Sequence, residues 1–490
     1  MNVSAVSRSR VAAVVLAALA SVVLLAAARS HVQTAAPTSP AASRDAPAAP
    51  SVAPAESARA ERARAESARA ESAPLEGAPR ATATVIWLTG DVLLDPAFRR
   101  SGAASGDPAE AYASMIAPVA KHWRADGDDA TVIANLESPV ATLRREPDAY
   151  LEQAEEIFER TGHRRIPSPL NAPQSLLDAL TRSGVDAVSL ANNHALDQDR
   201  AGLAETLDAA QARGLATLGA GRSDADARAP RFYGPAGARI AVLATFVRDR
   251  AEPPWLSANE ARLSVVDART IDEVRRAAET SDAVIVAVHV VAELLARPTP
   301  GTRELTASLI AAGADLVVVH GPHVVAPVER IESGGRRGIA AFSIGNFVSD
   351  MGKEARPGRE DAPRFGDDAA DKWHDPRTRS GLVVRVALTP GAALDVAFLP
   401  TWMHSDRWLI DQGLAQPPIT FSVEPLAACG PPLQLRAAWP PEGYDAMESW
   451  VARHRDAALA AARITSAACA RCTEGAPCRW RGDAHLLRLQ

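Results

Sequence analysis

The sequence predicts an α/β fold in which helices cover mixed β-sheets. Short apolar runs alternate with helical patterns along residues 84–400, as expected for βαβ crossovers. Six of these runs end in a short polar motif, which is typical of buried parallel strands with functional residues at their carboxyl ends. Two later runs, Gly381 to Leu388 and Leu394 to Leu399, are joined by Thr-Pro-Gly-Ala and indicate an antiparallel hairpin.

The six motif-bearing strands are expected to bring their motifs to one sheet edge. These strands are Thr84 to Thr89, Thr131 to Ala134, Val185 to Leu190, Ala283 to Val288, Leu316 to Val319 and Ile339 to Phe342. Another strand is expected at Arg239 to Phe246. The predicted helices are Pro108 to Arg124, Pro173 to Ser183, Gly202 to Arg213, Ile271 to Glu279, Arg303 to Ala312 and Tyr444 to Ala470.

Residues 1–30 have the form of a signal peptide or N-terminal membrane anchor. Arg8 and Arg10 precede an uncharged apolar run from Val11 to Ala28. The length of this run leaves both cleavage and retention as an anchor open. The two arginines favour a cytoplasmic N-terminus. We therefore expect the rest of the chain to be extracytoplasmic, periplasmic or at the cell surface, and either membrane-anchored or secreted.

Three further regions follow from composition. Residues 31–83 are rich in Ala, Pro, Ser, Glu and Arg and are expected to form a disordered spacer. Residues 84–423 form the expected main domain, and residues 424–490 a cysteine-containing C-terminal appendage. The net charge of -6 and the absence of a Lys/Arg-rich run interleaved with aromatics argue against nucleic-acid binding.

All four cysteines fall in the appendage, at Cys429, Cys469, Cys472 and Cys478. In an exported chain, an even number of cysteines predicts two disulfides, with Cys429 bridged to one of the other three. The alternative is a zinc site, because Cys469 and Cys472 have the spacing of metal ligands.

Carboxylate, amide and imidazole side chains are concentrated in the six polar motifs. They are ligand types for Mn, Fe, Zn or Mg, so we expect a divalent metal. Asp91 could anchor a cation, or it could cap a turn or helix. Glu137 could bridge two cations or act as a base, with Asn135 orienting it. His320 and His323 flank Gly-Pro in a turn after a strand, where both imidazoles can face one point, although a structural turn would have the same sequence.

Two long segments resemble the capsule synthesis protein CapA family, also called poly-γ-glutamate synthesis proteins. The first is Ser-Leu-Ala-Asn-Asn-His-Ala-Leu-Asp at residues 189–197, followed by a helix and by Gly219-Ala220-Gly221. The second is Ala-Gly-Ala-Asp-Leu-Val-Val-Val-His-Gly-Pro-His-Val at residues 312–324, followed by Phe-Ser-Ile-Gly-Asn-Phe at residues 342–347. The resemblance covers Val85 to Pro400 and implies a metallophosphoesterase-like, four-layered α/β/β/α sandwich with mixed sheets.

The resemblance also implies roles for individual residues. Asn193-His194 is similar to a pair whose amide oxygen ligates metal and whose imidazole polarises a leaving or transferred oxygen. Asp197 would orient His194, or would cap the helix that follows. His289 and Glu293 match the family's His-x-Gly-x-Glu, with Val290-Val291 in place of the usual aromatic residue and glycine.

One position departs from the family pattern. Metallophosphoesterases usually carry a His two residues after the first Asp, and this chain has Leu93 there. One ligand of a two-metal site is therefore missing. Asn346 could position a substrate carbonyl or water, or could simply form a turn with Gly345.

We expect seven residues to converge in one cleft, because each ends or closely follows a predicted strand: Asp91, Glu137, Asn193, His194, His289, His320 and His323. The candidate metal ligands are Asp91, Asn193, His289, His320 and His323, the candidate catalytic residues are His194, Glu137, Asp197 and Glu293, and the candidate substrate-binding residues are Asn135 and Asn346.

The resemblance supports three functions. The first is a metal-dependent hydrolase or transferase in capsule or poly-γ-glutamate biosynthesis, export or anchoring, acting on an anionic extracytoplasmic polymer. The second is a non-catalytic polymer-binding export component on the same fold. The third is a generic metallophosphoesterase. Expected partners are poly-γ-glutamate or a related anionic polymer, the membrane through the N-terminal segment, and other capsule synthesis proteins.

The charged stretch from Met351 to Ser380 is predicted to be an exposed loop over the site. Its five arginines, Arg356, Arg359, Arg364, Arg377 and Arg379, could bind carboxylates of an acidic polymer, or its acidic residues could cancel them.

Overall fold

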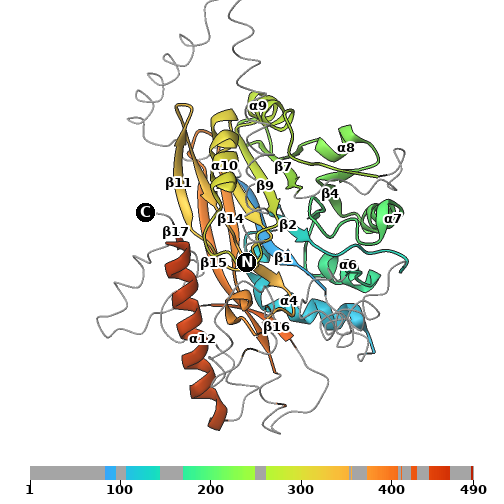
Figure 1. Cartoon of the computed structure of the whole chain (residues 1–490), viewed down its shortest axis with the longest axis vertical. Helices are drawn as coiled ribbons and strands as arrows, with labels where there is room; N and C mark the ends of the chain where they lie inside the picture. The colour runs from blue at the N-terminus through green and yellow to red at the C-terminus, as the bar shows by residue number, and fades with distance from the viewer. Residues whose placement is uncertain are drawn as a thin grey trace, which may run out of the picture. The chain divides into compact units, whose positions relative to one another are not determined.

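Two mixed β-sheets packed face to face form the centre of the fold (Figure 1). The computed structural model describes residues 83–94, 106–127, 129–143, 169–248, 261–352, 355, 372, 374–406, 410, 421–426, 441–463 and 487–488. The predicted signal or anchor segment, the cysteines and nearly all of the spacer lie outside these residues. None of the described helices is long and apolar enough to cross a membrane.

The larger sheet, called here the first sheet, has the strand order β16-β15-β14-β1-β2-β3-β4. Strands β1 to β4 are mutually parallel, while β14, β15 and β16 are antiparallel to their neighbours. β13 also pairs with β1, and β17 with β15. The bounds are β1 Thr84–Val92, β2 Thr131–Leu136, β3 Ala187–Ser189, β4 Ala216–Leu218, β13 Asn346–Val348, β14 Ser380–Leu388, β15 Asp395–Ser405, β16 Phe421–Pro425 and β17 Leu487–Arg488.

The smaller sheet, called here the second sheet, has the order β11-β12-β10-β9-β7-β6. Its central strands are parallel and its two edge pairs are antiparallel. The bounds are β6 Arg231–Tyr233, β7 Ile240–Val247, β9 Ala283–Val290, β10 Leu316–His320, β11 Val328–Ser333 and β12 Arg336–Ala341. The short strands β5 Ala220–Gly221 and β8 Arg262–Leu263 form a separate antiparallel pair.

Helices cover the outer face of each sheet. One core joins the first sheet to α4 Pro108–Arg124, α6 Gln174–Arg182 and α7 Asp199–Gln211. A second joins the second sheet to α9 Thr270–Thr280 and α10 Pro300–Ala312, while a third fills the space between the sheets with side chains such as Ile86 and Ile285. The short helix α8, Asp224–Arg228, lies beside β5. The predicted α/β/β/α sandwich with mixed sheets is confirmed by these three apolar interfaces.

The C-terminal helix α12, Pro441–Ala462, packs against β14 and β15. The ring of Trp402 on β15 meets that of Trp450 on α12 edge to face, at 5.3 Å between centroids. The guanidinium of Arg379 lies 4.9 Å from the Trp402 ring centroid and 5.5 Å from that of Trp450. We call Arg379, Trp402, Trp450 and the stacked His454 the aromatic clamp. The expected boundary between residues 423 and 424 falls inside β16.

The clamp corrects part of the predicted polymer-binding loop. Arg379 is only 3% exposed, so it cannot reach a polymer. Arg377 pairs with Asp375 at 2.6 Å and belongs to the 3-10 helix Pro376–Arg379. Arg356, Arg359 and Arg364 lie outside the described residues. Arg379 therefore stabilises the chain itself, whereas Arg377 is 41% exposed and stays accessible.

Candidate metal centre

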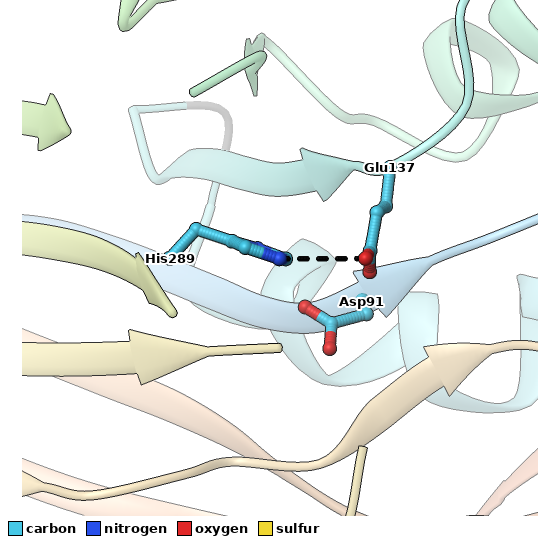
Figure 2. A group of neighbouring side chains, drawn as sticks. All are labelled: Asp91, Glu137 and His289. Atoms are coloured by element: carbon cyan, nitrogen blue, oxygen red, sulfur yellow. Dashed lines mark ion pairs between the residues drawn. The ribbon is translucent and has the colours of Figure 1, made fainter. Parts of the chain in front are cut away.

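The candidate site lies where strands of both sheets end. Asp91 and Glu137 come from β1 and the residue after β2, whereas His289 comes from β9 (Figure 2). His320 is the last residue of β10. The expectation of a single sheet edge is therefore wrong. The chain itself makes the crossing, since residues 342–345 lead from β12 in the second sheet to β13 in the first. Face-to-face packing of the sheets brings the two sets of strand ends together.

Asp91 is a fully hydrogen-bonded buried carboxylate. Its Oδ1 accepts from Asn135 Nδ2 at 2.8 Å and from His320 Nδ1 at 3.0 Å. Its Oδ2 accepts from the Gly321 backbone at 3.2 Å and lies 3.1 Å from His323 Nδ1. Burial opposes ionisation of Asp91, but the hydrogen bonds from the two histidines outweigh it, and its pKa lies well below the ordinary value. Because a carboxylate only accepts, His320 presents Nδ1–H to Asp91, and the Nδ1–H of His323 is shared between Asp91 Oδ2 and Asn346 Oδ1. Both histidines keep Nε2 for a ligand.

Glu137 has the opposite environment. It is fully buried, and neither carboxylate oxygen has a hydrogen-bond partner among the described residues. His289 Nε2 is 3.4 Å and His323 Nε2 3.8 Å from Oε1. Burial raises the pKa of Glu137 to about 8, although the charges of His323 and His194 act against this rise. A buried acceptor without a donor indicates that something outside the chain completes it.

Two buried amide oxygens share this property. Asn135 Oδ1 and Asn193 Oδ1 also lack a hydrogen-bond partner among the described residues. Carboxylate and amide oxygens without hydrogen-bond partners, together with imidazole nitrogens, are ligand types that fit a divalent cation. Atoms of Asp91, Glu137 and His289 that can ligate a metal lie within 4.8 Å of one another. The residues present therefore fit the metal that the sequence predicts, and Asn135 joins the candidate ligands through its oxygen.

Local backbone geometry holds the histidines in place. Gly321 has φ +97°, and a Cβ there would lie 2.0 Å from the Val290 carbonyl and 2.8 Å from His289 Nε2. Only glycine lets the two strand ends approach this closely, so the glycine that permits the close approach is Gly321, opposite Val290, and not a glycine at position 291. His323 itself has φ +58°, an unusual conformation that is typical of residues held for function.

Asn346 and Asn192 position other side chains. His323 Nδ1 donates to Asn346 Oδ1 at 2.9 Å, and Asn346 Nδ2 donates to the Thr378 carbonyl at 2.9 Å. Asn192, fully buried, donates to the Leu136 carbonyl and accepts from the His194 backbone. The sequence indicates no role for Asn192, although it lies in the same motif. The only sequence signal for it is its position next to Asn193.

His194 and Asp197 form a pair beside this cluster. His194 Nδ1 lies 2.7 Å from Asp197 Oδ2, which also accepts from the Leu170 backbone at 2.6 Å. Burial lowers the pKa of His194, but the charge of Asp197 outweighs it and the pKa is raised. Asp197 does not cap α7, since the residue before that helix is Gln198. Of the two roles considered for Asp197, the structure shows the orienting contact.

Glu293 is not part of the buried cluster. It follows β9, its side chain is 35% exposed, and its Oε1 is 4.0 Å from Lys372 Nζ. Its charge nevertheless reaches Glu137 and His323, whose pKa values it helps to raise. Leu93, where a histidine was expected, is 3% exposed and packs with Leu170 and Met351.

The fold and site together define a mixed α/β sandwich with a buried carboxylate, amide and imidazole cluster, a class suited to holding a divalent metal. Residues 85–351, more than half of the 490-residue chain, match the model of the family described as bacterial capsule synthesis protein PGA_cap. The chain therefore belongs to this family of bacterial capsule synthesis proteins.

Two curated relatives agree with this family. Capsule biosynthesis protein CapA of Bacillus anthracis is 30% identical over 190 residues, which cover 37% of this chain and 44% of that protein. PGA biosynthesis protein CapA of Bacillus subtilis (strain 168) is 28% identical over 229 residues, which cover 45% of this chain and 53% of that protein. The chain thus matches about half the length of these relatives.

Two solved structures are distant in comparison. A hypothetical protein from Thermus thermophilus has a TM-score of 0.33 and 17% identity, covering 70% of this chain and 99% of that one. A novel phosphatase from Mycoplasma pneumoniae has a TM-score of 0.33 and 9% identity, covering 65% of this chain and 94% of that one. The fold assignment rests on the sheets and cores of this chain.

Proposed function

We propose that this chain is a divalent-metal-dependent hydrolase or transferase that acts on poly-γ-glutamate, or a related anionic polymer, outside the cytoplasm. The observation that carries the proposal is the set of buried oxygens of Glu137, Asn135 and Asn193 without hydrogen-bond partners among the described residues. Membership of a capsule synthesis family supports an anionic polymer as the substrate. The secretion-like N-terminus supports a location outside the cytoplasm.

The residues that would hold the metal are Asp91, Asn135, Glu137, Asn193, His289, His320 and His323. When bound, a divalent cation polarises an amide or phosphoryl oxygen and lowers the pKa of water. Asp91 fixes the imidazoles of His320 and His323 by accepting their Nδ1–H groups. Such outer contacts set the ring orientation and the tautomer.

His194 is the candidate proton carrier. Its Nδ1 is committed to Asp197 at 2.7 Å, so Nε2 is the atom that can give a proton to a leaving group or take one from a nucleophile. Asp197 is itself held by the Leu170 backbone, which fixes the pair. Asn346 accepts a hydrogen bond from His323 Nδ1 and so fixes the orientation of the His323 ring.

A second candidate function is a non-catalytic polymer-binding component. The observation in its favour is Leu93, a buried apolar side chain at a position where the resemblance implies a metal-binding histidine. This arrangement would leave fewer ligands than a two-metal phosphoesterase needs. The third candidate, a generic metallophosphoesterase, is disfavoured for the same reason.

Metal content and polymer cleavage test the proposal. We would measure bound Mn, Fe, Zn and Mg in the purified chain and follow the length of poly-γ-glutamate after incubation. Stoichiometric metal that is lost in His323→Gln and Glu137→Gln but kept in Glu110→Gln, an exposed helical carboxylate, supports the enzyme. Absence of metal, with polymer binding intact, supports the non-catalytic function. Cleavage of a simple phosphodiester would instead favour the generic phosphoesterase.

A further inference from the structure

Lys372 lies at the solvent-exposed rim of the site. Its Nζ is 4.0 Å from Glu293 Oε1, and the two side chains are 31% and 35% exposed. The buried cluster below them is almost inaccessible, with Glu137 at 0% and His323 at 2%. The sequence contains only three lysines, and no motif in the sequence indicates a function for this one.

The backbone of Lys372 is hydrogen-bonded to a segment near the first sheet. Its carbonyl accepts a hydrogen bond from Gly352 N–H at 2.8 Å. Gly352 shortly follows β13 of the first sheet, whereas Glu293 follows β9 of the second. The pair therefore joins segments that emerge from the two sheets whose strand ends build the site.

The charges of this pair reach the buried groups. The positive charge of Lys372 is among those that act on His194, and the negative charge of Glu293 acts on Glu137 and His323. The partly exposed carboxylates of Asp197 and Glu293 would repel an anionic polymer. The positive charge of Lys372, 4.0 Å from Glu293, offsets this repulsion at a partly exposed position.

We propose that Lys372 is a positioning residue that binds a carboxylate of the polymer in place of Glu293. The inference rests on the proposed function, whose substrate is an anionic polymer. At 4.0 Å the ion pair is loose, so a carboxylate from the substrate exchanges with a similar group and Lys372 stays compensated. Glu293 competes with the polymer carboxylate for Lys372 and orients the lysine side chain until the polymer binds. An ammonium on a flexible stem suits this exchange.

The test is equilibrium binding of fluorescent poly-γ-glutamate to the full chain at fixed ionic strength. Lys372→Gln should weaken binding about tenfold, as expected for loss of one charge-assisted contact, and Lys372→Arg should restore most of it. Glu293→Gln should tighten binding roughly twofold to fivefold because the competing carboxylate is gone. Lys121→Gln, which removes an exposed lysine on α4, is the matched control and should leave binding unchanged.

Lys372→Gln and Glu293→Gln are expected to change polymer binding in opposite directions, which distinguishes a positioning role from a purely structural contact. If Glu293→Gln weakens binding as Lys372→Gln does, the pair only holds the rim together and the inference is wrong. Unchanged binding in Lys372→Gln also overturns it, and leaves the proposed function standing. Wild-type protein that binds metal but no poly-γ-glutamate overturns both the role of Lys372 and the polymer assignment. Dependence on Lys372 with inorganic polyphosphate alone would replace the carboxylate by a phosphoryl group and contradict the proposal as stated.

Discussion

The aromatic clamp and the candidate metal centre both bury charge, but they compensate it differently. In the clamp, Arg379 donates from Nε to the Met403 carbonyl at 2.7 Å and from Nη1 to the Ala355 carbonyl at 3.2 Å, with Trp rings against the guanidinium. Only its Nη2 lacks a hydrogen-bond partner among the described residues. In the metal centre, Glu137 has no donor among the described residues. A buried guanidinium held by two carbonyls and two aromatic rings stabilises the fold, whereas a buried carboxyl group with neither oxygen hydrogen-bonded indicates a ligand.

The largest effect on stability is expected in the clamp. Trp402→Ala should lower the free energy of unfolding by about 3–5 kcal/mol, because a fully buried indole is removed and Arg379 loses its aromatic contact. Urea unfolding followed by circular dichroism measures the change. Metal binding by the surviving folded protein should be unaltered. A loss below about 1 kcal/mol would mean that the clamp contributes little to stability.

Gly321→Ala should affect both stability and the site. The new Cβ would lie 2.0 Å from the Val290 carbonyl and 2.8 Å from His289 Nε2, so the strand ends must separate. We expect a loss of about 1–3 kcal/mol and much weaker metal binding, measured by thermal unfolding and metal titration. Gly335→Ala is the matched control, since it also has positive φ, +74°, but no heavy atom within 4 Å of its Cβ. Equal metal affinity in both variants would contradict the role of Gly321.

Glu137→Gln should stabilise the metal-free protein at high pH while removing its stabilisation by metal. Burial raises the pKa of Glu137 from 4.5 to about 8, so the folded metal-free protein keeps a proton that the unfolded chain releases. Stability of the metal-free protein should therefore fall as pH rises from about 5 to 8. In Glu137→Gln this dependence should flatten, with a gain of about 1–3 kcal/mol at pH 8 and little change at pH 5.

The measurement is urea unfolding across this pH range in the presence of a chelator. A metal competes with the proton on Glu137, so the stabilisation by added metal should grow with pH in the wild-type chain and be absent in the variant. Identical pH profiles for the two proteins would show that Glu137 does not carry the raised pKa.

The smallest effect is expected for Asp197→Asn. The variant loses the charge that raises the pKa of His194, so that pKa should fall, while metal affinity stays within about twofold. Stability should drop by about 0.5–1.5 kcal/mol through weaker bonds to His194 and the Leu170 backbone. NMR titration of the histidine resonances measures the pKa. An unchanged His194 pKa would remove Asp197 from its orienting role.

Local patterns made much of the fold predictable. The helix from Pro108 to Arg124 has the predicted bounds, because an Asp cap, a proline at its start and a periodic apolar face define it locally. The strands before the six motifs exist, though β1 extends to Val92 and β10 to His320, since polar motif residues continue the pairing. The short edge strands β4, β6 and β11 were not predicted, because brief or half-exposed strands give little apolar signal.

Which sheet each strand joins depends on pairing between residues far apart in sequence, and no local pattern encodes this. The sequence by itself determined the α/β alternation, the residue types at the strand ends and the family. Only the tertiary structure decided that the motifs face each other from two sheets and that Arg379 packs against two indoles. It also decided that Asp91 is surrounded by donors while Glu137 has none. The physical reason is that burial and hydrogen-bond partners depend on how the whole chain packs. Secondary-structure propensity and side-chain chemistry depend on the residue and its neighbours in sequence.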